Sequence, residues 1–182
     1  DDSLRISSGT ALYIMDNDSR LPWPPQESPT EPLASLSVPA EYLRQAFREV
    51  SYAASLDGGP PRIQHCYLEI GPTFSLLTAT DTHRLAHRQL VGEWEGSASG
   101  IIPSCAIEAV KATRETGDST AHLSADRARF EGADWSVDSR LIPERYPKYA
   151  EVLPTTPPAA TVILDRHALL AALRRIAVLE PS

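Results

Sequence analysis

The sequence predicts an α+β fold with a mostly antiparallel sheet. Short apolar runs at the spacing of β-strands outnumber the stretches at helical spacing. The helical stretches follow strands that end at a proline or an aspartate. Sixteen prolines and nine glycines in 182 residues indicate many short elements separated by turns, rather than a long helical array.

The first elements read as a hairpin followed by a crossing segment. Two short apolar-rich runs, residues 4–7 and 11–15, flank Ser8-Gly9-Thr10, which is typical of a hairpin turn. Four prolines within residues 22–29 exclude helix and central strand there. We interpret residues 21–32 as an extended linker with a domain boundary near residue 33; a proline-rich docking motif is the alternative.

A strand and an amphipathic helix follow the boundary. Residues 36–38 are expected to form a short strand, and Pro39 suits the start of a helix. Apolar side chains then recur at three and four residues from Leu43 to Ala54, the spacing of one buried helical stripe. Arg44 and Arg48 stand one turn apart on the opposite face, so they are expected to project together away from the core.

The remainder of this domain alternates strands with one further helix. Strands are expected at residues 63–70, 74–80, 84–91 and, three in number, between 122 and 141, with a turn at 92–96. A second helix is expected from Pro103 to Thr116, closed by Gly117.

Part of the sequence repeats internally. The strand and helix at residues 36–50 match residues 162–176 at an offset of 126. Each copy has a short strand, a helix-starting residue and an amphipathic helix, and a hairpin with a crossing segment precedes each one. The chain therefore divides into residues 1–33, the closing hairpin and linker of one unit; 34–155, a complete unit; and 156–182, the opening strand and helix of a third.

Composition restricts the class of protein. Seventeen basic and 24 acidic residues give a formal charge of −7, which argues against a surface that grips nucleic acid throughout but allows a locally basic face. Cys66 and Cys105 lie in apolar runs and are expected to be buried free thiols in a reducing compartment. No apolar run approaches a membrane span and the first residues do not resemble a signal peptide, so the cytoplasm is the expected location.

Two motifs carry a resemblance to a known family. Residues 78–86, TATDTHRLA, resemble the ATDGHRLA signature of the central domain of the bacterial sliding clamp, the β subunit of DNA polymerase III. Residues 139–154, SRLIPERYPKYAEVLP, resemble the motif that closes that domain. The resemblance is strong from about residue 35 to 155, and it accounts for the internal repeat, because this family's chain is three copies of one fold.

The resemblance implies a DNA-clamp fold, with an antiparallel sheet and two helices packed on one face. It also implies a non-catalytic, ring-shaped homodimer that encircles duplex DNA without sequence specificity and needs no cofactor or metal. The implied partners are DNA polymerase and other replication or repair proteins, which bind through linear peptides, and the clamp loader. The residues expected to face DNA are Arg44, Arg48, Arg62 and Lys111, and their alternative role is that of a solvated helix face.

In this family, partner peptides insert apolar side chains into a cleft between the central and third domains. The matching residues here are Ile63, Thr80, His83, Arg84, Leu85, Pro147 and Val152. The sequence also departs from the family pattern: Thr82 and His65 replace glycines, and Glu151 stands where some members have arginine. Ser104 and Cys105 stand where basic residues are common, so these changes remove positive charge from the groove and the inner face.

An enzymatic function has weaker support in the sequence. Asp81, His83 and His87 could be imagined as metal ligands, but a turn is expected to separate them and Arg84 would repel a cation. His65 and Cys66 are adjacent on a predicted strand, so their side chains point to opposite faces. Glycine-rich phosphate-binding motifs are absent from the sequence. Two hypotheses therefore stand: a segment of a DNA-encircling clamp, and a stand-alone interaction module with the clamp fold that does not encircle DNA.

Overall fold

A computed structural model describes residues 3–8, 11–16, 31–55 and 58–178. The chain divides into two compact units, Asp1–Tyr146 and Pro147–Ser182, and each is described by itself. Most of the expected linker at 21–32, and the turn of the N-terminal hairpin, lie outside the described residues. The domain boundaries expected near residues 33 and 155 stay predictions.

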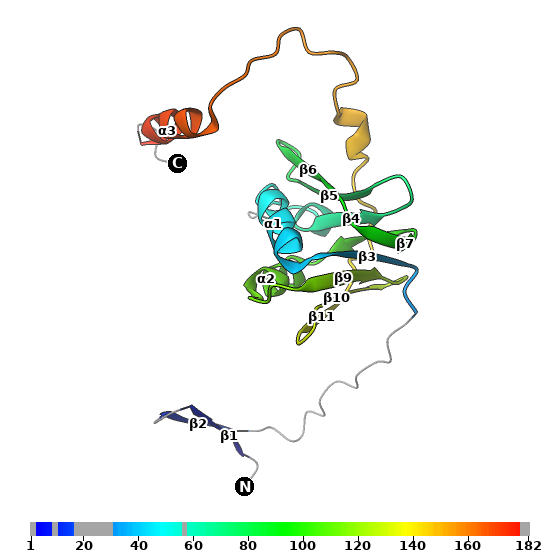
Figure 1. Cartoon of the computed structure of the whole chain (residues 1–182), viewed down its shortest axis with the longest axis vertical. Helices are drawn as coiled ribbons and strands as arrows, with labels where there is room; N and C mark the ends of the chain where they lie inside the picture. Colours follow the sequence, from blue (N-terminus) through cyan, green and yellow to red (C-terminus); the bar gives the residue numbers. More distant parts are fainter. Residues whose placement is uncertain (1–2, 9–10, 17–30, 56–57, 179–182) are drawn as a thin grey trace. The chain divides into compact units, whose positions relative to one another are not determined.

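The first unit contains two antiparallel sheets and a separate hairpin (Figure 1). The hairpin is β1 (Ser3–Ser8) with β2 (Ala11–Asp16), as expected. The other strands are β3 (Ala34–Pro39), β4 (Cys66–Ile70), β5 (Ser75–Thr80), β6 (Leu85–Leu90), β7 (Glu93–Gly96), β8 (Ala98–Ile102), β9 (Asp118–Leu123), β10 (Arg127–Glu131) and β11 (Ser136–Arg140). They form a five-stranded sheet in the order β11-β10-β9-β3-β7 and a four-stranded sheet in the order β6-β5-β4-β8. The antiparallel α+β prediction is confirmed, with the strands shared between two sheets.

Two helices cover one side of these strands (Figure 1). They are α1 (Ala40–Ser51) and α2 (Ser104–Ala112), which contact each other, and a short 3-10 helix, η1 (Pro61–Ile63), precedes β4. The expected stripe of α1 is buried, with Leu43, Phe47 and Val50 at most 1% exposed. The Phe47 ring meets Phe130 of β10 edge to face, with ring centroids 5.6 Å apart, so α1 packs directly on the five-stranded sheet.

Alternation along the strands separates the core from the outer face. In β3, Ala34, Leu36 and Val38 are buried on the helix side, whereas Ser35 and Ser37 point away from the helices. Neighbouring strands follow the same rule, which makes the outer face of the five-stranded sheet polar.

The expected turn at residues 92–96 is wrong, because Glu93–Gly96 form β7 and pair with β3. Glu93, Trp94 and Glu95 alternate polar and apolar side chains as a strand does, but the flanking glycines Gly92 and Gly96 indicated a turn. In the structure the two glycines instead permit a close approach of β7 to β3. A Cβ atom at Gly92 would clash with the carbonyl oxygen of Ser37, and one at Gly96 would clash with that of Leu33.

The second unit contains a 3-10 helix, η2 (Tyr149–Val152), and a helix, α3 (Arg166–Ala177). Asp165 begins α3 as expected, because its Oδ1 accepts a hydrogen bond from the Ala168 N–H at 2.7 Å. The strand expected at residues 162–164 is wrong, since these residues have no regular structure. Val162, Ile163 and Leu164 are exposed and pair with no strand among the described residues, and an isolated strand has no partner for its backbone groups.

The two cysteines differ in environment. Cys66 is buried, which raises the pKa of its thiol to about 12, whereas Cys105 is exposed, so the expectation of two buried thiols is wrong for Cys105. Cys105 lies on the first turn of α2, on the side away from the buried Ala106 and Ile107. Within the described ranges, no helix has both the length and the apolar character needed to cross a bilayer.

Candidate functional site

Four of the expected cleft residues meet in the turn between β5 and β6. Two side chains hold this turn. Thr80 Oγ1 donates to the carbonyl oxygen of Arg84 at 2.7 Å and accepts from the Thr82 N–H at 3.1 Å. Asp81 Oδ1 accepts from the N–H groups of His83 and Arg84, both at 2.9 Å. Five consecutive residues are thereby fixed around two short polar side chains.

Asp81 is the electrostatic centre of this turn. The backbone N–H groups of Arg84 and His83 lower the pKa of its carboxyl group, and the Arg84 guanidinium assists, with its Nε 2.9 Å from Oδ2. Asp81 and His87, two of the residues considered as metal ligands, make hydrogen bonds within the protein instead. Asp81 caps the turn, and His87 Nδ1 lies 3.0 Å from the Thr78 hydroxyl. No group of three or more His, Cys, Asp or Glu residues suited to a metal occurs among the described residues.

Thr82 adopts a conformation that favours glycine. Its φ is +79°, and it is the only described residue other than glycine with a positive φ. A β-branched side chain in the left-handed region is costly, so this turn retains the backbone geometry of a glycine while carrying a threonine. The motif departure at Thr82 thus leaves the turn in place at the cost of local strain.

The turn presents a charged and a hydrophobic side. His83 and Arg84 are exposed, Leu85 is half-buried, and Thr80 is buried beneath them. The Arg84 guanidinium lies over the exposed ring of Tyr52, 5.8 Å from its centroid, at the end of α1. This surface can therefore offer a peptide both an aliphatic contact and polar anchors.

The other expected cleft residues are placed separately. Ile63 lies in η1, where its side chain is buried, so it is not part of the turn. Pro147 and the exposed Val152 belong to the second unit, and the meeting of all seven residues stays a prediction. Glu151, also in η2, pairs with Lys148 at 3.2 Å and is exposed.

The segment that leads to Pro147 is anchored on the first unit. The Tyr146 ring stacks on Tyr67 of β4, with centroids 4.7 Å apart and planes at 4°. The Tyr146 hydroxyl donates to the carbonyl oxygen of Thr78 at 3.4 Å. Residue 146 is therefore fixed against β4 and β5, the strand that ends at Thr80.

The expected DNA-facing residues differ in exposure and in charge pairing. The expectation that Arg44 projects away from the core is wrong: it is 6% exposed, and its Nη1 donates to Thr113 Oγ1 at 3.4 Å. Thr113 ends α2, so the cause is the packing of α2 over this face of α1. Arg48, one turn later, is exposed and has no ion-pair partner among the described residues.

The remaining two cations are neutralised in part. Lys111 of α2 pairs with Glu108 at 2.7 Å and donates to Ser51 Oγ of α1 at 3.4 Å. Arg62 of η1 pairs with Glu144 at 3.6 Å. Arg48 is therefore the candidate whose charge is most available.

Two departures from the family pattern lie in contact at the start of α2. His65 Nδ1 accepts from the Ser104 N–H at 3.1 Å, and Ser104 Oγ donates to the Gln64 carbonyl oxygen at 2.5 Å. Burial lowers the pKa of His65, against smaller opposing effects of the Gln64 carbonyl and the Glu144 carboxylate. Because Pro103 has no side-chain acceptor, His65 supplies the cap that joins the start of α2 to the segment before β4.

Sequence reasoning missed this cap and the turn role of Asp81. Asp81 follows a strand and precedes its hydrogen-bonded N–H groups by two and three residues, a local pattern typical of aspartate in turns. The contact of His65 with Ser104 spans 39 residues, so no local signal could have found it.

Comparison with known proteins identifies relatives of this arrangement. A sequence model of the family described as the DNA polymerase III beta subunit, central domain, matches residues 37–148. The beta sliding clamp of Synechococcus elongatus is 30% identical over 195 residues of alignment, which cover 98% of this chain and 49% of that protein. The chain thus spans about half the length of the curated relatives that it matches.

Solved structures share the fold. The DNA polymerase III beta subunit of Thermotoga maritima superposes with a TM-score of 0.77 at 24% identity, over 97% of this chain and 48% of that one. The Helicobacter pylori beta clamp bound to a DNA ligase peptide gives a TM-score of 0.67 at 21% identity, over 85% of this chain and 44% of that one.

Proposed function

The chain belongs to the DNA polymerase III beta subunit family, the beta sliding clamps, and from this membership we propose that it is the central part of a processivity factor. The full protein would form a ring-shaped homodimer that encircles duplex DNA without reading its sequence and is placed there by a clamp loader. It would tether DNA polymerase and other replication or repair proteins and perform no chemistry itself. A role at the bacterial chromosome implies a cytoplasmic location.

The observation that carries this proposal is the match of the family model over residues 37–148. The physical argument for sliding is that a ring holds DNA by topology, so it needs only weak, salt-sensitive contacts to phosphate. Arg48 of α1 is suited to such a contact, because it is exposed and has no ion-pair partner in the described part of the chain. Lys111 and Arg62 would contribute less, since Glu108 and Glu144 lie beside them.

We propose that partner peptides bind at the turn between β5 and β6 together with Pro147 and Val152. The fixed backbone of residues 80–84 supports this assignment, because a rigid turn loses little entropy on binding. Leu85 offers an aliphatic wall, and His83 and Arg84 offer polar anchors. The Helicobacter pylori clamp, with its DNA ligase peptide, shows that a relative of this fold takes such a ligand.

Calorimetric titration of that DNA ligase peptide against the 182-residue chain tests the assignment. The double variant Leu85→Ala plus Pro147→Ala is expected to weaken binding by roughly tenfold or more, since it removes two apolar contacts. The matched control is Leu33→Ala plus Pro32→Ala, which changes the same residue types at exposed positions outside the turn. Equal affinity of the two double variants, or no binding by the unaltered chain, would remove the cleft assignment.

The stand-alone interaction module remains the second candidate, and the departures at Thr82 and Glu151 favour it. The strained turn at Thr82 and the acidic Glu151 alter the peptide surface rather than the fold. Peptide binding by the full protein without retention on circular DNA would support this second candidate.

A further inference from the structure

We propose that the free edge of β7 is a docking strand for an extended, lysine- or arginine-rich segment of a partner protein. This surface lies on β3 and β7 and is distinct from the peptide turn between β5 and β6. It therefore goes beyond the proposed function.

Among the described strands, none pairs with the outer backbone edge of β7. The strand is the last of the five-stranded sheet and pairs with β3 alone among the described strands. The outward N–H and C=O groups of such an edge strand can pair with an added strand. Because Gly92 and Gly96 have no Cβ atom, β7 can lie close against the backbone of β3.

A groove accompanies this edge on the outer face of the sheet. Two adjoining hollows of about 200 and 390 Å³ share Ser35 and Glu95 in their walls. The register pairs Glu93 with Ser37 and Glu95 with Ser35, which places both carboxylates on this outer face. Trp94 pairs with the buried Leu36 and so points to the helix side, where it is 47% exposed.

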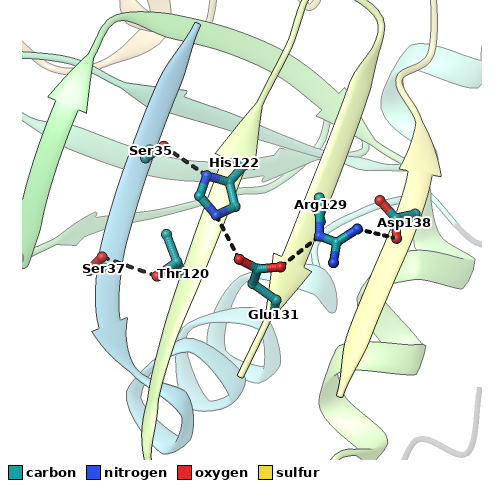
Figure 2. A network of polar contacts seen from close by, with 7 residues as sticks. All are labelled: Ser35, Ser37, Thr120, His122, Arg129, Glu131 and Asp138. Carbon is teal, nitrogen blue, oxygen red and sulfur yellow. Dashed lines mark hydrogen bonds and ion pairs between the residues drawn. The ribbon is translucent and has the colours of Figure 1, made fainter. Parts of the chain in front are cut away.

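Four charged or titratable side chains of β9, β10 and β11 pair with one another on the outer face. Figure 2 shows a continuous network from β3 to β11. His122 bridges Ser35 and Glu131 at 2.8 and 3.2 Å, and Arg129 joins Glu131 and Asp138 at 2.6 and 3.3 Å. Hydrogen bonds to Glu131 from Arg129 and His122 lower the pKa of its carboxyl group, so this network keeps its negative charges paired.

Glu93 and Glu95 lie outside that network. Neither makes an ion pair or a side-chain hydrogen bond with the residues that the structure describes, and Glu31 adds a third carboxylate at the far end of the groove. Among the residues that the structure describes, no basic side chain lines either hollow. Charge complementarity therefore selects a cationic occupant, and duplex or single-stranded nucleic acid would be repelled.

The pairing geometry also defines the partner's sequence pattern. Side chains of an added strand would alternate between the two faces of the sheet. Those beside Glu93 and Glu95 would be lysine or arginine, and those beside Trp94 would be apolar. An alternating basic and apolar segment satisfies both faces at once.

The probe is the peptide Lys-Val-Lys-Val-Lys-amide with fluorescein on its N-terminal amine, titrated against the 182-residue chain by fluorescence anisotropy. Glu93→Gln plus Glu95→Gln is expected to weaken binding about tenfold. The control Glu41→Gln plus Asp134→Asn removes the same charge from exposed positions on α1 and the β10–β11 turn, and should leave the affinity within about twofold. Equal loss in both pairs would overturn the proposal, because it would mean bulk attraction to an acidic protein.

Backbone methylation tests the strand pairing directly. Alternate residues of a strand direct their N–H groups to the same side, so N-methyl groups on the two valines and on the lysines block opposite edges of the peptide. One methylated peptide should bind like the parent and the other should not. Equal binding of the two, or no binding of the parent up to about 1 mM, would overturn the proposal. The Glu93 and Glu95 variant should bind the DNA ligase peptide normally, which separates this result from that of the cleft.

Discussion

Thr82 concentrates backbone strain in one residue of the turn between β5 and β6. A left-handed conformation costs a residue with a Cβ atom about 1–2 kcal/mol. A glycine at this position would avoid that cost, but the greater conformational freedom of glycine in the unfolded chain would offset part of the gain in stability. Thr82→Gly should therefore raise the free energy of unfolding by about 1 kcal/mol in urea denaturation. Thr73→Gly, on an exposed loop without a positive φ, is the control and should lower it. A Thr82→Gly protein no more stable than the parent would contradict the strained turn.

His65 makes the anchoring of α2 depend on pH. Its pKa is lowered in the folded chain, chiefly by burial, so the unfolded chain binds the proton more readily. The stabilisation is complete above the unfolded value of about 6.5 and is lost as the pH falls through the lower folded value.

Urea denaturation at pH 7.5 and pH 5 checks this dependence. The parent should lose more stability between these two values than His65→Gln, which cannot take up a proton. His83→Gln, at an exposed position, should behave like the parent. A parent and a His65→Gln protein with the same pH dependence would disprove the role of His65.

At the scale of elements, Arg44 joins α1 to α2. Its buried stem packs between the helices and its guanidinium reaches Thr113, whereas the stem of Arg48 lies in solvent. Arg44→Ala should lower the free energy of unfolding by about 1–2 kcal/mol, and Arg48→Ala should change it by less than about 0.5 kcal/mol. Chemical denaturation of the two variants measures the difference, and equal effects would refute the packing role.

The predictability of each element follows from where its information lies. The stripe of α1 was predictable, because the spacing of Leu43, Phe47 and Val50 alone makes one face apolar. The burial of Arg44 was not predictable, because α2, some 60 residues later in the chain, covers that face of α1. Residues 162–164 carry a strand pattern, yet a strand also requires a partner, which no periodicity supplies.

In the candidate site, too, the features set by local sequence were predictable and those set by distant segments were not. The sequence indicated a turn between strands at residues 74–80 and 84–91, and the structure confirms a turn between β5, which ends at Thr80, and β6, which begins at Leu85. The assignment of these residues to a peptide surface stays a prediction. The family motif has a glycine at the position of Thr82, which is consistent with the positive φ found there. The contact of His65 with Ser104 and the pairing of β7 depend on segments distant in sequence, so only the fold reveals them.

At the scale of the whole molecule, a formal charge of −7 opposes tight binding to DNA. The isolated chain should bind a short duplex only weakly, with a dissociation constant above about 10 μM at 0.15 M salt. Arg48→Glu should weaken this binding further, since it reverses the most available positive charge on α1. Fluorescence anisotropy with a labelled duplex measures both values. Submicromolar binding, or no effect of Arg48→Glu, would contradict this assignment of the DNA-facing surface.

We propose that this clamp-family domain takes partner peptides at the turn between β5 and β6 together with Pro147 and Val152. Nuclear magnetic resonance of the isotopically labelled 182-residue chain, with the DNA ligase peptide added stepwise, tests it most directly. The amide shifts are expected to concentrate at residues 80–85 and 147–152, while those of β7 and β11 stay unchanged. Shifts confined to other elements, or none at saturating peptide, would contradict it.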